Sequence, residues 1–157
     1  MLTLTRTPSW ILTALSGLFL ILIFPQFNLE FLAWFALIPL FFAIQNQTLG
    51  TVAGRGFFAG MIFYFFGLNW VTNTLVNYGN ISKGLSFLIL GLLAAYLSFY
   101  VALSCVLTVK WSQGKPVYFF LLAPLVWTSL EYLRSTHATF GFSWLGLGYS
   151  QFQTLTI

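Results

Sequence analysis

The stretch from Leu85 to Val109 reads LSFLILGLLAAYLSFYVALSCVLTV and contains no charged side chain. A helix that crosses a bilayer needs about 20 predominantly apolar residues, within a range of about 17–25. The stretch therefore predicts a membrane-spanning helix, which we place at residues 84–110. Two further stretches, Phe57–Val76 and Val117–Leu133, fall in the same range and predict spanning helices over 55–77 and 116–134.

Two shorter apolar stretches precede these helices. They are Trp10–Phe24 and Phe31–Ile44, and their flanks extend them to helices over about 8–27 and 28–46. Pro8 suits the first turn of a helix, and Asn28 is the expected N-cap of the second helix. The two helices then form a tight hairpin of two spans. The alternative is a re-entrant pair that enters the membrane and returns.

The composition also indicates that the chain is embedded in a lipid bilayer. Only 5% of the residues are charged, whereas 59% are hydrophobic and 20% aromatic. Soluble domains carry roughly a quarter charged residues. We therefore expect one domain, residues 1–157, with an all-α fold. It is a polytopic integral membrane helix bundle of about five spans, followed by an outer loop over 135–157 that is rich in glycine and aromatic residues.

The basic residues orient this bundle. With the N-terminus in the cytoplasm, most of them fall on the cytoplasmic side, in agreement with the positive-inside rule. The cytoplasmic group is Arg6, Arg55, Lys110 and Lys115, and the outer group is Lys83 and Arg134. The net charge of +4 is spread over helix ends without a basic run, so no nucleic-acid partner is expected.

Glycine and proline mark the helices locally. Gly56 and Gly60 form a G-x-x-x-G pair, which permits close approach of another membrane helix. Pro39 and Pro124 fall inside expected helices and predict a kink in each.

Glu131 and Arg134 are the most distinctive polar pair. At a spacing of three residues they share one helix face and can form an ion pair. The structural interpretation is a salt bridge at the helix end that locks the following loop. The functional interpretation is a contact with a lipid headgroup or substrate.

A second polar feature recurs every four residues on the helix expected over 55–77. Asn69, Asn73 and Asn77 form a stripe that Trp70 joins. Such stripes make hydrogen bonds between helices or line a polar cleft.

The sequence contains no recognisable catalytic or metal-binding set. Cys105 is the only cysteine and lies in the middle of a span, without the adjacent base that activates a thiol. His137 is the only histidine, whereas a metal site needs three or four ligands. We expect no catalytic residue, no metal and no cofactor.

Four motifs occur in order along the chain. They are LAWFALIPL at 32–40, GFFAG at 56–60 with GLNWV at 67–71, YG at 78–79, and EYLR at 131–134 with GFSWL at 141–145 and LGYSQ at 147–151. Together they resemble the amino-terminal membrane region of the apolipoprotein N-acyltransferase family. Two departures occur: Tyr132 replaces a usual Trp, and Ser143 stands where the family commonly has Pro.

The resemblance implies a reaction and its partners. The family transfers an acyl chain from a membrane phospholipid to the N-terminal diacylglyceryl-cysteine of apolipoproteins, through a thioester, in the bacterial cytoplasmic (inner) membrane. A Glu–Lys–Cys set in a periplasmic nitrilase-like domain or subunit performs the chemistry, and no residue here matches that set. We therefore expect a multi-pass membrane domain that is inactive alone.

The same resemblance places the last motif block beneath the catalytic domain. Combined with the polar stripe, it yields candidates for lipid or interface contact: Glu131, Arg134, Trp144, Tyr149, Gln151, Asn69, Trp70 and Asn73. An alternative function is a non-catalytic module that binds lipid or lipoprotein and pairs with a separate catalytic subunit. A small transporter is a further alternative, which the lack of charges in the middle of the spans disfavours.

Overall fold

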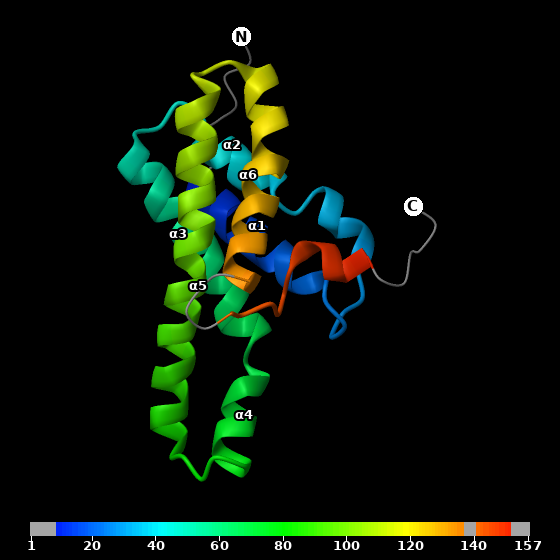
Figure 1. Ribbon diagram of the computed structural model, residues 1–157, viewed down its shortest axis with the longest axis vertical. Coiled ribbons are helices and arrows are strands. Elements are labelled where there is room, and N and C mark those ends of the chain that lie inside the picture. The colour runs from blue at the N-terminus through cyan, green and yellow to red at the C-terminus, as the bar shows by residue number, and fades with distance from the viewer. Residues whose placement is uncertain (1–8, 137–140, 152–157) are drawn as a thin grey trace.

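The computed structural model describes residues 9–136 and 141–151, and every regular element in these ranges is a helix (Figure 1). This confirms the all-α prediction. In order, the elements are α1 (Ser9–Leu22), the 3₁₀-helix η1 (Glu30–Trp34), α2 (Ile38–Ile44), α3 (Leu49–Gly67), α4 (Trp70–Asn77), α5 (Lys83–Ser112), α6 (Pro116–Thr136) and the 3₁₀-helix η2 (Leu147–Gln151).

Three of the described helices, α3, α5 and α6, are long and apolar enough to cross a membrane. The apolar segments Ser9–Leu22 and Glu30–Ile44 are shorter than a span. Helix α5 has 30 residues and rises about 45 Å, well beyond the hydrocarbon core of about 30 Å. Its first turns and α4 form a hairpin that extends away from the rest of the bundle at the lower end of Figure 1.

The prediction of one continuous helix over 28–46 is wrong. The chain instead forms η1, a short turn, and then α2, in which Pro39 occupies the first turn. The cause is the missing N–H of Pro39, which cannot bond to the carbonyl of Phe35 and so prevents one helix from running through. Asn28 is not an N-cap either, since it has a φ of +54° and ends the turn after α1. Asparagine tolerates that left-handed conformation better than most residues.

The helix expected over 55–77 is also divided. Helix α3 begins earlier, at Leu49, because the Thr48 hydroxyl accepts a hydrogen bond from the backbone N–H of Thr51 at 3.4 Å. The same helix ends at Gly67, and α4 begins at Trp70. Glycine is a poor helix former and asparagine favours helix ends, so Gly67 and Asn69 mark the break.

Glycines allow α3 to pack closely on its neighbours. A Cβ placed on Gly56 would lie 2.9 Å from the Cα of Ala102, and one on Gly60 would lie 2.9 Å from the Cα of Ser98. The expected close approach at the G-x-x-x-G pair is thus confirmed, with α5 as the partner helix. On another side of α3, Gly17 of α1 approaches the carbonyl oxygen of Ala59 in the same way.

Arg55, expected as the first residue of the helix over 55–77, lies inside α3. It is buried, and its guanidinium donates hydrogen bonds to the carbonyl oxygen of Ala43 and to the Ser9 hydroxyl. The ring of Trp10 lies 5.9 Å from the guanidinium carbon. Because Ala43 is in the last turn of α2, the cation also lies at a helix C-terminus, where positive charge is favoured. Arg55 therefore ties α1, α2 and α3 together at one end of the bundle.

Replacing Gly60 with Leu should destabilise the bundle. The added Cβ meets the backbone of α5, which cannot yield as a flexible side chain can, and overpacking of this kind costs about 1–3 kcal/mol. Thermal unfolding in detergent measures the effect. Gly54→Leu is the matched control on the same helix, because nothing lies within 4 Å of its Cβ position. Equal unfolding temperatures for the two variants would contradict the packing described.

Candidate functional site

The last turns of α6 hold residues 141–151, which we call the outer segment. Arg134 donates from Nη1 to the carbonyl oxygen of Trp144 at 3.2 Å, and Glu131 Oε1 accepts from the backbone N–H of Leu147 at 2.9 Å. The N–H of Phe142 also donates to the carbonyl oxygen of Arg134, at 3.2 Å. We call the Glu131 and Arg134 side chains together the latch.

The latch is different from the salt bridge expected from the sequence. Among the described residues, Glu131 and Arg134 form no direct ion pair, so that prediction is wrong, although the pair does lock the following loop. The reason is that each side chain is engaged with a backbone group of the outer segment instead, and polar backbone groups need such partners. Arg134 is only 1% exposed, and its guanidinium carbon lies 5.5 Å from the ring centre of Tyr64.

A second tie fixes the far end of the outer segment. Gln151 donates from Nε2 to the carbonyl oxygen of Glu30 at 3.0 Å, which joins η2 to η1. The outer segment is therefore held at both ends, on α6 and on η1.

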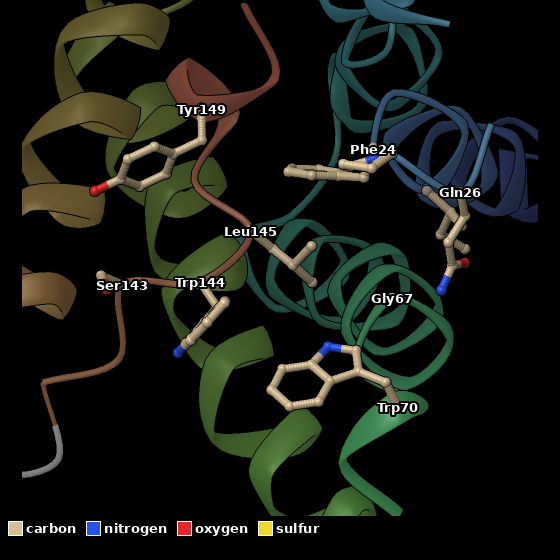
Figure 2. Close-up of a pocket in the computed structure, with 10 residues that line it drawn as sticks. Phe24, Gln26, Gly67, Trp70, Ser143, Trp144, Leu145 and Tyr149 are labelled. Atoms are coloured by element: carbon tan, nitrogen blue, oxygen red, sulfur yellow. The ribbon is translucent and has the colours of Figure 1, made fainter. Parts of the chain in front are cut away.

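Between its two ends, the outer segment forms one wall of a cavity of about 570 Å³ (Figure 2). The other walls come from the end of α1 with its following turn, and from the break between α3 and α4. The lining residues are Ile21, Phe24, Pro25, Gln26, Gly67, Trp70, Ser143, Trp144, Leu145 and Tyr149.

The aromatic and aliphatic side chains set the shape of this cavity. The rings of Trp70 and Trp144 lie 5.4 Å apart at 59°. Figure 2 shows Leu145 pointing into the space between Phe24 and Trp70. Gly67 permits this approach, because a Cβ at that position would lie 2.8 Å from Leu145 Cδ1. Gly67 thus leaves room for the outer segment to pack on α3.

The lining of the cavity is mainly apolar. Among the described residues it contains no charged side chain and no thiol, and its polar groups come from Gln26, Ser143, Tyr149 and the indole N–H groups of the two tryptophans. Cys105 is buried within α5 and is not among the lining residues. The cavity is therefore suited to an apolar ligand.

The structure brings most of the expected site residues together. Trp70, Trp144 and Tyr149 line the cavity, while Glu131, Arg134 and Gln151 hold its wall. Asn69, Asn73 and Asn77 are not among the lining residues. Asn69 is exposed in the α3–α4 break and the other two are exposed on α4, and their side chains make no hydrogen bond to another described residue. The interhelical bonds expected for this stripe are therefore not formed in the described part. His137 lies outside the described residues.

Sequence reasoning missed seven of the ten lining positions, among them Ile21 at the end of α1, Gly67 and Ser143. Phe24, Pro25 and Gln26 belong to the hairpin turn, and Leu145 belongs to the GFSWL motif. A usable signal existed for the turn, because Pro25 marks the outer end of the first apolar stretch. The approach of Leu145 to Gly67 joins positions distant in sequence and had no local signal.

Comparison with known proteins identifies relatives of this chain. Residues 16–157 match the family model described as the apolipoprotein N-acyltransferase N-terminal domain. The chain is 33% identical over 148 residues to an apolipoprotein N-acyltransferase of Geobacter metallireducens, covering 94% of this chain and 28% of the relative. The corresponding protein of Haemophilus influenzae is 32% identical over 143 residues, covering 91% and 26%. That of Aquifex aeolicus is 35% identical over 135 residues, covering 85% and 28%. The chain thus spans little more than a quarter of the length of these relatives.

Replacing Glu131 with Leu should loosen the outer segment. The Leu147 amide loses its charged acceptor, and a hydrogen bond to a charged group contributes about 1.5–3 kcal/mol, so amide hydrogen exchange there should rise roughly 10-fold or more. Glu131→Gln is the matched control, since its side-chain oxygen can still accept from Leu147. An unchanged exchange rate in Glu131→Leu would show that the latch does not hold the segment.

Proposed function

The chain belongs to the apolipoprotein N-acyltransferase family, and on this basis we propose that it is the membrane domain of an enzyme that acylates lipoproteins. The complete enzyme moves an acyl chain from a membrane phospholipid to the N-terminal diacylglyceryl-cysteine of an apolipoprotein. Because the chain spans little more than a quarter of its relatives, the reaction requires a nitrilase-like domain or subunit that carries the Glu–Lys–Cys set. The 157 residues alone are inactive on this proposal.

The observation that carries this proposal is the latch. The EYLR, GFSWL and LGYSQ motifs, which are the most specific part of the family resemblance, meet in one place. EYLR supplies Glu131 and Arg134, and the other two motifs supply the segment that they hold. An apolar cavity beside this segment is what a membrane domain needs if it presents lipid to a separate catalytic centre. Residues of all three motifs thus serve one role, which is to form and hold the wall of the cavity.

We propose that the bundle lies in the bacterial inner membrane with its N-terminus in the cytoplasm. Lys83 begins α5 and Lys110 lies in the last turn of that helix, so the two lie at opposite ends of the bundle. Lys115 lies beside the end of α2, which Arg55 ties to the start of α1. This distribution follows the positive-inside rule. The latch, the cavity and the α4–α5 hairpin then face the outer side, where the catalytic domain would be placed.

The α1 and η1–α2 hairpin completes five membrane-embedded segments on this proposal. Helix α1 begins beside Arg55 of α3, through the Ser9 hydroxyl, and the turn after it reaches the cavity beside Gly67 at the end of α3. The hairpin therefore extends alongside α3 over most of the length of that helix. Its apolar surface suits the lipid bilayer, as do the surfaces of the three longer helices.

A second candidate is a binding module that has no catalytic partner in the same polypeptide. The cavity lining, which has no catalytic group, favours this alternative over an independent enzyme. On this alternative, the domain holds lipid or lipoprotein for a separately encoded catalytic subunit.

A chimera tests the proposed function. Joining this chain to the remaining part of the Geobacter metallireducens relative, in membranes depleted of the native enzyme, should convert diacylated lipoprotein to the triacylated form. Mass spectrometry of the lipoprotein N-terminus measures the conversion. Glu131→Leu in the chimera should lower it about 10-fold, in line with the loss of the latch bond, whereas Glu131→Gln should leave most of it.

The control is the 157-residue chain alone, which should give no conversion. An intact, membrane-inserted chimera without activity would contradict the proposal, and so would transfer by the chain alone.

A further inference from the structure

We propose that one ordered water molecule binds behind the latch, where it accepts a hydrogen bond from the indole N–H of Trp127 and donates one to the carboxylate of Glu131. On this assignment Trp127 is a positioning residue, which acts on the outer segment through Glu131. The site belongs to the geometry of the latch, and it does not depend on the proposed function.

The indole N–H of Trp127 is a buried donor that needs a partner. Trp127 is 9% exposed, and its Nε1 atom is buried and forms no hydrogen bond with a described residue. Native structures pair nearly all such donors with protein groups or with ordered water. Trp127 precedes Glu131 by four residues on α6, so the two share one face of the helix, and the indole N–H faces the carboxylate. A donor and an acceptor that face each other without a direct hydrogen bond are suited to a bridging water.

A cavity of matching size lies at this point. Its volume is about 10 Å³. A single buried water needs about 10–15 Å³, so the cavity holds one water and excludes a lipid chain or any larger ligand. Helices α3, α5 and α6 all contribute polar side chains to the lining, which are Tyr64, Tyr100, Ser104, Trp127, Glu131 and Arg134.

The lining offers the hydrogen bonds that a buried water requires. Such a water makes about two to four of them. Trp127 supplies the donor. Glu131 accepts from the N–H of Leu147 through Oε1, and a carboxylate has the capacity to accept further bonds. The hydroxyl of Ser104 donates to the carbonyl oxygen of Val101 at 2.8 Å, so its oxygen can accept the second proton of the water.

The charges around the cavity select water over an ion. Among the described lining residues Glu131 is the only carboxylate, and the guanidinium of Arg134 belongs to the same lining. The guanidinium repels a metal cation, and hard cations need about six or more oxygen ligands. The carboxylate repels an anion in turn. A neutral molecule that both donates and accepts hydrogen bonds satisfies this lining.

The consequence of the site is a fixed orientation of the Glu131 carboxylate. The water holds the carboxylate against Trp127 on α6 and Ser104 on α5, so that Oε1 stays directed at the N–H of Leu147. Trp127 thereby contributes to the hold on the outer segment without touching that bond.

Nuclear magnetic resonance of the indole protons tests the site directly. The 157-residue chain is prepared with isotope-labelled tryptophan in lipid nanodiscs, and Trp127→Phe identifies the indole signal of residue 127. We expect a cross-relaxation peak between this N–H and a long-lived water, whose sign in the rotating frame separates it from proton exchange. A Trp127 N–H without such a peak would overturn the proposal.

An isosteric replacement separates the hydrogen bond from packing. Replacement of Trp127 by β-(3-benzothienyl)alanine keeps the fused rings and exchanges the N–H for sulfur. The same replacement of Trp111, which is 52% exposed near the end of α5, is the matched control. Hydrogen exchange of the Leu147 amide should rise about threefold in the variant at 127, because the water loses its donor, and should stay unchanged in the control.

Equal exchange rates in the two variants would show that Trp127 only packs, and would overturn its positioning role. If the variant at 127 does not fold, the water peak of the unmodified chain decides alone. Neither readout needs acyl transfer, so an inactive chimera with an intact water peak would reject only the proposed function.

Discussion

The outer segment depends on Glu131 and Arg134, which supply hydrogen-bond partners to its backbone groups. Each side chain binds the backbone of that segment: Glu131 at the N–H of Leu147, and Arg134 at the carbonyl of Trp144. Charged groups make stronger hydrogen bonds than neutral ones. The two ionisable residues therefore fix an irregular stretch of chain against a helix, and the cavity wall depends on that fixation.

The helices that support the outer segment are held together by close packing. Small residues let α3 approach α5 at Gly56 and Gly60 and approach α1 at Gly17. In a bilayer, helices gain no hydrophobic free energy from meeting one another, so such contacts depend on van der Waals packing. Because α1 and α3 are held together in this way, the turn after α1 and the end of α3 remain near each other. The outer segment then encloses the space between them.

Periodicity and length predicted the features that depend on local composition. The apolar stretch around Cys105 became α5, and the last motif block became a segment locked to the end of α6. Predictions failed where a single residue, or a contact between parts of the chain distant in sequence, determines the local structure. Pro39 divided one expected helix, and the Gly67–Asn69 region divided another. Arg55 was expected at the cytoplasmic end of a helix, whereas it lies inside α3 and donates to a carbonyl of α2 and a hydroxyl of α1.

The distance between α4 and the outer segment tests the central claim most directly. Spin labels at Asn73 and Gly148, both at open positions, report this distance by pulsed electron paramagnetic resonance, with Cys105→Ser as the background. A latch that holds the outer segment in place predicts one narrow distribution, which becomes broad when Glu131 and Arg134 are both replaced by Leu. The same distribution with and without the latch residues would contradict the account.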